Sequence, residues 1–499
     1  MKTSRVSGQR GRLVGWAVIA TIAVAIPLGC GGGSSSKKKS SPALPVIQNI
    51  NGSSDPASPA STAIEINGLD FGSAPGEVHF TDATDPSNVA IEIPVASAWS
   101  DFGIVVVVPA AGCVGNFPIP GTVAVTVVTA GGTSNGIDLD FVDTPSFSVN
   151  TVTWMTTTPL PTALRGLGTS PVRVDDVSAY AVIAGGNDGS AHLDLVYTYP
   201  LSPDGTLGAW RLEASSLPAP RAYHGMVEAN PGNAPLINSA DRFVYVLGGQ
   251  QDPLDAPGGT DTAFMARVDL TNGSVGTWSQ TTTLPEPLIG PTVTIYNGHV
   301  YLIGGLRSDG TPTDAVHSAR IRSNGTLEPW LQATDPYPVP ISFGRVFGFG
   351  ASIYVVGGDP NGSMDPSEQS GSGQSDVYYA SARNGTVGAW TAGSSTIARR
   401  KKHILWSAFG QMISAEGIYQ GGPGSQVAER SSIQPDGTIS TWRGMTGSNI
   451  LPIDVFNASA FVSPIRVFGG APRFMMFGGE LLASPAGQLS DAVYYNDAP

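Results

Sequence analysis

The chain has 499 residues, more than one ordinary domain holds, so two or more hydrophobic cores are expected. Charged residues make up 13% and apolar residues 41%, and there are 63 Gly and 40 Pro. Many short strands joined by tight turns explain this composition, because Gly and Pro favour turns. The net charge of −13 disfavours a nucleic-acid partner, because such a partner requires clustered Lys and Arg.

The amino-terminal segment has the pattern of a secretory signal. Four basic residues precede an apolar run over residues 13–28: Lys2, Arg5, Arg10 and Arg12. The run is too short for a membrane span, which needs roughly 20 apolar residues. It ends in Leu28-Gly29-Cys30 and resembles the lipobox of bacterial lipoproteins, although Pro27 stands where that family usually has Leu. The resemblance implies a signal peptide over residues 1–29 and lipidation of Cys30; an ordinary signal peptide or an uncleaved anchor is the alternative.

The segment after Cys30 is a predicted tether. Residues 31–44 consist almost entirely of Gly, Ser, Lys and Pro, a composition typical of flexible linkers. We therefore expect residues 30–44 to join a lipid anchor in the bacterial cell envelope, at the outer membrane or the cell surface, to the folded part of the chain.

Residues 45–143 have the pattern of a small β-sandwich. Runs of alternating apolar and polar residues predict half-buried strands at residues 63–66, 77–80, 90–93, 104–108 and 123–128. The segment resembles IPT/TIG domains in several motifs: Pro45-Val46-Ile47, the turn at residues 68–72, Trp99-Ser100, and residues 131–135. The resemblance implies an immunoglobulin-like fold that acts as a spacer or an interaction module. The second cysteine, Cys113, lies in this segment and receives no role.

Residues 144–499 contain an internal repeat. A Gly-Gly pair follows an apolar run at residues 185–186, 248–249, 304–305, 357–358, 421–422 and 478–479. Tryptophans recur in step at positions 154, 210, 278, 330, 390 and 442. Asn-Gly or Asp-Gly turns precede five of these tryptophans, and such turns are typical of β-hairpins. Each repeat therefore predicts four antiparallel strands.

These repeats resemble kelch blades, including those of the galactose-oxidase type of propeller. The resemblance implies a six-bladed β-propeller over residues 144–499. The first tryptophan follows a lone strand, and the last repeat ends without one. We therefore expect residues 148–154 to supply the fourth strand of the last blade, which would close the circle and remove exposed edges.

Candidate binding residues come from the irregular loops. The loops between second and third strands vary in length, and they share one face with the blade-to-blade loops. Variable loops on a rigid scaffold are where binding usually resides. The candidate binding face is formed by Asn187, Asp188, Arg221, His224, Gln251, Asp252, Arg307, Asp309, Asp359, Asn361, Arg400 and His403.

The sequence contains no recognisable constellation for chemistry. In four repeats an aspartate precedes an aromatic residue by three positions, whereas Asp314 precedes His317 and Gln426 replaces the acid in the fifth repeat. We expect these aspartates to fix a local turn rather than form a carboxylate ring. A galactose-oxidase site would need a cysteine, which residues 144–499 lack, and the six histidines show no metal-ligand spacing. We predict no catalytic residues, no metal and no cofactor.

The predicted function is therefore that of a surface-displayed binding or scaffold lipoprotein, and the sequence leans against an enzyme. Its partner would be an envelope or extracellular protein or a glycan, and exposed aromatics on the loop face would favour a glycan. Two alternatives remain open at this stage. One is a carbohydrate-active enzyme that uses Asp188, Asp252 or Asp359 at the channel mouth. The other is a purely structural envelope protein.

Overall fold

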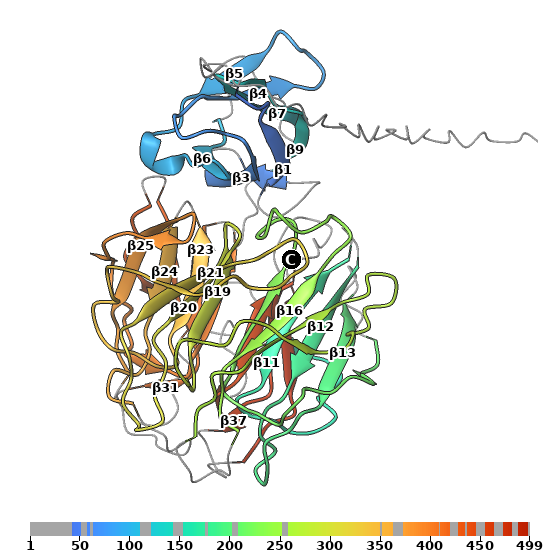
Figure 1. Ribbon diagram of the computed structural model, residues 1–499, viewed down its shortest axis with the longest axis vertical. Coiled ribbons are helices and arrows are strands. Elements are labelled where there is room, and N and C mark those ends of the chain that lie inside the picture. The colour runs from blue at the N-terminus through green and yellow to red at the C-terminus, as the bar shows by residue number, and fades with distance from the viewer. Residues whose placement is uncertain are drawn as a thin grey trace, which may run out of the picture. The chain divides into compact units, whose positions relative to one another are not determined.

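The computed structural model describes most of the chain. The described residues are 42–50, 57–59, 63–109, 121–142, 153–174, 178–201, 208–251, 258–349, 352–362, 373–408, 410–419, 428–434, 437–445, 455–463, 473–481 and 488–497. The predicted signal peptide, Cys30, most of the tether and Cys113 lie outside these ranges. Within them the fold is all-β, with the 3₁₀ turn η1 (Ala96–Ala98) beside many strands (Figure 1). No helix in the described ranges has the length and apolar character needed to cross a membrane.

The first folded part is a sandwich of two sheets. One sheet has the order β1 (Val46–Ile50), β3 (Ala63–Leu69) and β6 (Gly103–Val107). The other has the order β2 (Ala57–Pro59), β9 (Ile137–Val142), β7 (Gly121–Thr129), β4 (Glu77–Asp82) and β5 (Val89–Glu92), with β8 (Gly132–Thr133) beside β7. Alternate side chains of both sheets form one buried core, as the period-two pattern predicted. Trp99 lies in that core, and its indole N–H donates to the carbonyl of Gly72 at 3.0 Å.

The second folded part is a β-propeller of six four-stranded blades. Blade 1 has β11 (Gly168–Arg173), β12 (Ala179–Ala184), β13 (Val196–Leu201) and β14 (Arg211–Leu212). Blade 2 has β15 (Gly225–Ala229), β16 (Phe243–Leu247), β17 (Ala263–Arg267) and β18 (Ser279–Gln280). Blade 3 has β19 (Thr292–Tyr296), β20 (His299–Ile303), β21 (Val316–Arg320) and β22 (Leu331–Gln332). All pairings within these blades are antiparallel.

Blades 4 to 6 have the same order of strands. Blade 4 has β23 (Arg345–Phe349), β24 (Ser352–Val356), β25 (Val377–Arg383) and β27 (Thr391–Ala392), with β26 (Thr386–Val387) in its hairpin. Blade 5 has β29 (Ile404–Ala408), β30 (Gln411–Ala415), β32 (Glu429–Ser432) and β33 (Arg443–Gly444). Blade 6 has β35 (Ser459–Val462), β36 (Phe474–Phe477), β38 (Val493–Asp497) and β10 (Thr153–Thr156). Two short pairs lie between blades: β28 (Arg400–Lys401) with β31 (Ile418–Tyr419), and β34 (Val455–Phe456) with β37 (Glu480–Leu481).

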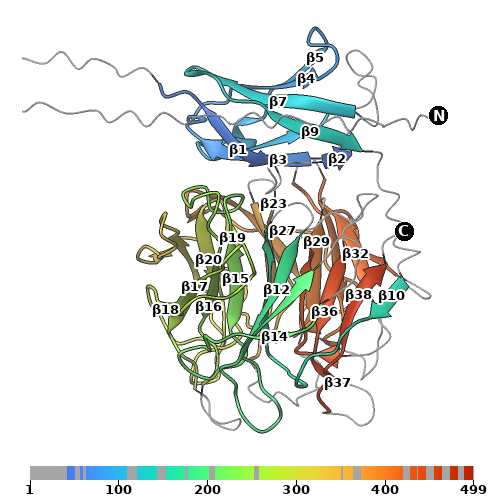
Figure 2. The same cartoon turned by 90° about the vertical axis from the view of Figure 1, so that its right-hand side faces the viewer.

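The last blade combines both ends of the propeller sequence. Strand β10 pairs antiparallel with β38, and Figure 2 shows the two strands side by side. The strand begins at Thr153, so residues 148–152 of the predicted closing strand lie outside the described ranges. The innermost strands contact one another in the order β11, β15, β19, β23, β29 and β35, and β35 contacts β11 again. The sheets therefore form a closed circle around a central channel.

The repeated tryptophans stabilise the contacts between neighbouring blades. In three blades the indole N–H donates to a backbone carbonyl that follows the fourth strand of the preceding blade: Trp210 to Thr158 at 3.3 Å, Trp330 to Thr282 at 3.4 Å and Trp442 to Ser394 at 2.8 Å. Trp154 lies against Trp406 of the neighbouring blade 5, with ring centroids 5.4 Å apart. The tryptophan period in the sequence therefore reflects a repeated contact between blades.

Candidate functional site: the central channel

A ring of left-handed residues surrounds one end of the channel. One residue just before each innermost strand has a φ between 54° and 58°, and we call the six residues the channel ring: Gly166, Tyr223, Gly290, Phe343, Lys402 and Asn457. At five of the six blade junctions, the N–H of a ring residue donates to the carbonyl of the ring residue in the preceding blade, at 2.7 to 3.2 Å. Ring residues without glycine's freedom therefore hold an unfavourable backbone conformation, which the hydrogen bonds stabilise.

The Gly-Gly pairs form a second series of bonds between blades. The second glycine of the pair donates its N–H to a carbonyl of the next blade, two residues before that blade's ring residue. The bonds run from Gly186 to Arg221, Gly249 to Leu288, Gly305 to Ile341, Gly358 to Arg400 and Gly479 to Leu164, at 2.7 to 3.0 Å. The pair at 421–422 lies outside the described residues. Both glycines have positive φ, which explains why the repeat contains glycine there.

Side chains of the channel ring occupy this end of the channel. Tyr223 covers Gly166, where an added Cβ would lie 2.5 Å from the tyrosine ring, and Phe343 covers Gly290 at the same separation. The two aromatic rings meet edge to face, with centroids 6.0 Å apart. The Lys402 ammonium lies over the Phe343 ring, 5.3 Å from its centroid. Burial raises the pKa of the Tyr223 hydroxyl, so this group stays neutral.

Two buried ion pairs flank these aromatics. The Arg165 guanidinium contacts the Glu480 carboxylate at 2.7 Å between blades 1 and 6. The Lys401 ammonium contacts the Asp359 carboxylate at 3.1 Å between blades 5 and 4, and both side chains are fully buried. Buried charges need such partners, because removing an isolated charge from water costs several kcal/mol. This end of the channel is therefore a packed structure of aromatic rings and paired charges.

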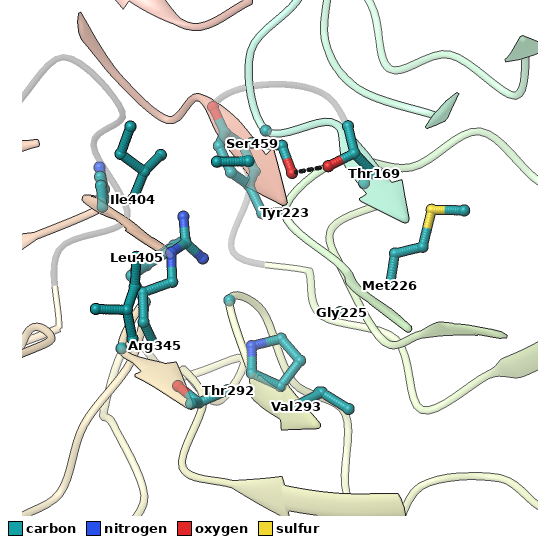
Figure 3. Close-up of a pocket in the computed structure, with 18 of the residues that line it drawn as sticks. Thr169, Tyr223, Gly225, Met226, Thr292, Val293, Arg345, Ile404, Leu405 and Ser459 are labelled. Carbon is teal, nitrogen blue, oxygen red and sulfur yellow. Dashed lines mark hydrogen bonds between the residues drawn. The ribbon is translucent and has the colours of Figure 1, made fainter. Parts of the chain in front are cut away.

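Beyond the ring, the channel encloses a cavity of about 220 Å³ whose walls come from all six innermost strands. Figure 3 shows Arg345 extending into this space, with Thr292, Thr169 and Ser459 around it. The cavity walls include the cations Arg345 and Lys402 as well as the neutral imidazole of His224, and none of the described wall residues is Asp or Glu. An acidic chain has therefore placed cations, without carboxylates, along its central cavity.

Arg345 spans three blades. It starts β23 in blade 4, its Nε donates to the backbone carbonyl of His403 in blade 5, and its Nη2 donates to that of Ala458 in blade 6 at 3.4 Å. Burial lowers the pKa of the guanidinium to about 10, so it remains charged at neutral pH. Its acceptors are neutral carbonyl groups, so they leave its formal charge uncompensated.

The predicted binding residues divide by burial. Six of them are buried, and His224 among these also lines the channel cavity: Asn187, Arg221, His224, Asp359, Arg400 and His403. Arg221 donates to the carbonyl of Gly248 at 2.9 Å, and Arg400 contacts Glu429 at 3.3 Å. These side chains lie inside the walls between blades, where they support the scaffold.

The remaining predicted residues lie nearer the surface. Asp309 and Asn361 are exposed, whereas Asp188, Gln251 and Arg307 are half-buried. Asp188 and Asp309 accept the hydroxyls of Ser190 and Thr311 and then backbone N–H groups of their own loops, which lowers the pKa of both carboxyls. Arg307 pairs with Glu286 at 2.7 Å. Asp252 lies outside the described residues. The structure thus separates the predicted face into buried supports and a smaller exposed set.

Two further sequence interpretations can be compared with the structure. The backbone carbonyls of four of the repeated aspartates, at 194, 261, 314 and 491, accept N–H groups of the blade-to-blade loops, so these bonds join distant segments and are not the local turn bonds that were expected. Among the described residues, no group of three or more His, Cys, Asp or Glu could hold a metal ion. Asp359, one of the three carboxylates of the glycosidase alternative, faces Lys401 instead of the channel cavity.

Sequence reasoning missed the residues that line the cavity. In each blade, one of these residues lies two positions after the channel-ring residue. The six residues at this position are Gly168, Gly225, Thr292, Arg345, Ile404 and Ser459. Arg345 is the charged member of that set, and this contrast is visible in the sequence once the repeats are aligned on their ring residues. Such an alignment requires knowing which residue of each repeat has the left-handed conformation. The sequence does not mark that position, because the ring residues are of five different types: Gly, Tyr, Phe, Lys and Asn.

No protein family model matches the chain. Beta-scruin of Limulus polyphemus is 27% identical over 150 residues, which cover 30% of this chain and 14% of that protein. Kelch repeat and BTB domain-containing protein 1 of cowpox virus is 26% identical over 178 residues (36% and 28%), and that of ectromelia virus is 25% identical over 212 residues (42% and 32%). The chain thus spans less than a third of the length of these relatives. Their similarity, together with the six four-stranded blades, supports a kelch-like propeller.

Proposed function

We propose that this chain is an interaction scaffold, displayed at the cell envelope, whose propeller holds a protein partner against its loop-rich face. The observation that carries the proposal is the double series of hydrogen bonds at the base of these loops. The channel ring and the Gly-Gly pairs join consecutive blades through backbone bonds. A frame joined in this way holds irregular loops in fixed positions, as binding loops require.

The exposed groups on this face favour a protein over a glycan. Gln251, Arg307, Asp309 and Asn361 present amides and charges of both signs, which suit the polar contacts of protein interfaces. The described tryptophans of the propeller are buried or half-buried, so their rings are engaged in packing. The kelch-repeat relatives are consistent with an interaction role, and the amino-terminal pattern with lipid anchoring supports display at the envelope.

The interaction is tested with exposed or half-buried loop positions, because buried Asp359 supports the fold. A loop variant combines Gln251→Lys, Arg307→Glu and Asn361→Lys. A control variant combines Ser323→Lys and Gln434→Lys, which are exposed in the hairpin turns on the other face. Proteins crosslinked to the full chain in its own envelope would be identified, purified and titrated against the chain and both variants. We expect at least tenfold weaker binding to the loop variant and unchanged binding to the control; equal weakening would contradict the proposal.

Display is tested separately at Cys30. Wild-type chain and Cys30→Ser are compared after metabolic labelling with a radioactive fatty acid and separation of membranes. We expect the label and membrane association to depend on Cys30. An unlabelled wild-type chain would remove the anchoring part of the proposal and leave the interaction part standing.

A further inference from the structure

The channel cavity carries positive charge that its walls do not neutralise. Buried cations in proteins are normally paired with carboxylates, because an unpaired charge pays a large desolvation cost. Three of the other buried cations of the propeller, Arg165, Arg400 and Lys401, follow this rule by meeting carboxylates, whereas Arg221 is bonded to backbone carbonyls and to the Thr262 hydroxyl. Arg345 departs from it, since its hydrogen-bond acceptors are two backbone carbonyls and none of the described cavity walls contributes an acid.

The geometry leaves part of this guanidinium facing the cavity. Nε and Nη2 are bonded to the walls, and Nη1 has no bond to any described residue. Arg345 also reaches the carbonyl of Ala458, the residue immediately before Ser459. The charged group therefore lies on the side of the cavity where Ser459 and Thr169 meet, as Figure 3 shows.

Hydroxyl groups add hydrogen-bond donors to the same cavity. Thr169 Oγ1 and Ser459 Oγ are 2.7 Å apart, so one hydroxyl donates to the other and the acceptor keeps its own hydrogen for a further partner. Thr292 also lines the cavity, and the residue is only 2% exposed. Its hydroxyl has no hydrogen-bond partner among the described residues. An unpartnered buried hydroxyl costs about 1–3 kcal/mol, which a bound acceptor would offset.

We propose that the central channel binds a small organic carboxylate of the hydroxy-acid or sugar-acid class, with its carboxylate on Arg345. A guanidinium matches a carboxylate in shape and charge, and hydrogen bonds between the two are stronger than neutral ones. The hydroxyls of Thr169, Thr292 and Ser459 complete the polar part of the site. This site is independent of the protein-binding loops.

The size and walls of the cavity restrict the ligand further. Its volume of about 220 Å³ is below the roughly 300–1,000 Å³ of pockets for drug-sized ligands, so the ligand is small. Met226, Val293 and Leu405 give the wall apolar patches against which a carbon skeleton packs. An inorganic anion would leave these patches unused.

The available charge favours a monoanion. Lys402 is the other cation of the cavity wall, but its ammonium lies over the rings of Phe343 and Phe456, at 5.3 and 5.9 Å from their centroids. That position directs its charge to the aromatic end of the channel. One guanidinium remains for the ligand, which matches a single carboxylate better than a phosphate with nearly two charges.

The test is calorimetric titration of the full chain with matched pairs of probes. Lactate and glucuronate are compared with lactamide and glucose, which have similar shapes without the charge, and with chloride and sulfate. We expect one of the two acids to bind saturably, at least tenfold more tightly than its neutral counterpart. Failure of both acids to bind up to about 10 mM, equal binding of acid and neutral probe, or equal competition by chloride or sulfate would each overturn the proposal.

Variants place the binding in the channel. Arg345→Met removes the charge, and Arg320→Met on the exposed end of β21 is the matched control. Because Arg345 also joins three blades, a second variant, Thr292→Val with Ser459→Ala, leaves Arg345 in place. We expect acid binding to be lost in the first variant, weakened about tenfold in the second and unchanged in the control. Unchanged binding in the second variant, or in a folded Arg345→Met chain, would overturn the assignment to this cavity.

Discussion

The Arg165 guanidinium and the Glu480 carboxylate form a buried ion pair, 2.7 Å apart, between the first and the last blade of the propeller. Arg165 Nε also contacts the amide oxygen of Asn187 at 3.3 Å. The pair lies at the junction where the circle closes, next to the ring bond from Gly166 to Asn457. Closure therefore depends on side-chain charge as well as on strand pairing between β10 and β38.

Removing one charge of this pair should destabilise the propeller strongly. We expect Glu480→Gln to lower the free energy of unfolding by about 3–5 kcal/mol, because it leaves the Arg165 charge buried and uncompensated. Urea unfolding followed by tryptophan fluorescence measures the effect. Glu286→Gln, at the more exposed pair with Arg307, is the control and should cost below about 1 kcal/mol. The double change Arg165→Met with Glu480→Leu should recover most of the loss; no recovery would contradict a charge-based explanation.

The channel ring makes a separate prediction at Gly290. An alanine there would adopt a φ of +58° and place its Cβ 2.5 Å from the Phe343 ring. We expect a loss of about 2–5 kcal/mol, from left-handed strain of 1–2 and overpacking of 1–3 kcal/mol. Thermal unfolding of Gly290→Ala measures the loss.

Gly310 supplies the matched control for the steric part. It also has a positive φ, +82°, but an added Cβ would meet nothing within 4 Å. Gly310→Ala should therefore show only the backbone strain, about 1–2 kcal/mol. Adding Phe343→Leu to Gly290→Ala should relieve the overpacking. Equal losses at Gly290 and Gly310 would show that contact with Phe343 is unimportant.

The period of the sequence predicted the fold because each repeated residue makes the same contact in several blades. Gly-Gly pairs bond to the next blade, and tryptophans pack between blades. The regular spacing of both in the sequence therefore indicates the spacing of the blades. Burial of the candidate site residues was harder to predict, since polar residues in glycine-rich loops usually face water. Asp359 and Asn187 are instead buried in isolated β-bridges, to Ser342 and to Arg165, at the position that Leu306 occupies in blade 3.

Aligned repeats contained part of this information. Arg221 and Arg400 occupy the same position relative to the channel ring as Leu164, Leu288 and Ile341, which are apolar and buried. A charged residue at an apolar position indicates a buried, paired group. The cavity around Arg345 could not be predicted in this way, because it depends on how far one long side chain reaches across two other blades.

Two tryptophans at equivalent positions allow the hydrogen bond between blades to be measured. Trp442 donates its indole N–H to the Ser394 carbonyl at 2.8 Å, whereas the indole N–H of Trp390 has no partner among the described residues. Replacing either with Phe keeps an aromatic ring at the same position. We expect Trp442→Phe to cost about 1–2 kcal/mol more than Trp390→Phe, because only the former breaks a bond and leaves a carbonyl unpaired. Thermal unfolding of the two variants checks this, and equal destabilisation would contradict it.

The last prediction concerns His224, which is inserted in the wall between blades 1 and 2. Its ring nitrogens have no hydrogen-bond partners in the described part of the chain, and added Cβ atoms at Gly168, Gly185 and Gly249 would lie 2.4 to 3.0 Å from its side chain. Burial, and then the Arg221 charge, lower the pKa of His224 from 6.5 to about 3. The unfolded chain therefore binds a proton at this residue below pH 6.5, while the folded chain does so only near pH 3.

This difference has a definite sign. Since the unfolded state binds more protons between pH 6.5 and 3, His224 makes the wild type lose about 1.4 kcal/mol of stability for each pH unit of acidification in that window. Glu228 acts in the opposite direction, because burial raises its pKa to about 7 and its contribution to stability is lost as the pH rises. Comparing variant with wild type at each pH cancels the Glu228 contribution, which both proteins share.

We therefore expect His224→Leu to gain stability relative to the wild type on acidification. The gain between pH 7.5 and pH 4.5 should be roughly 2–3 kcal/mol, because the variant lacks the group that the unfolded state protonates. Urea unfolding at half-unit intervals of pH measures it, with Met226→Leu as a neighbouring control that changes no titratable group. If the stability difference between His224→Leu and wild type stayed constant with pH, the pKa of His224 would be the same in the folded and the unfolded chain. The imidazole would then be in contact with water from the channel.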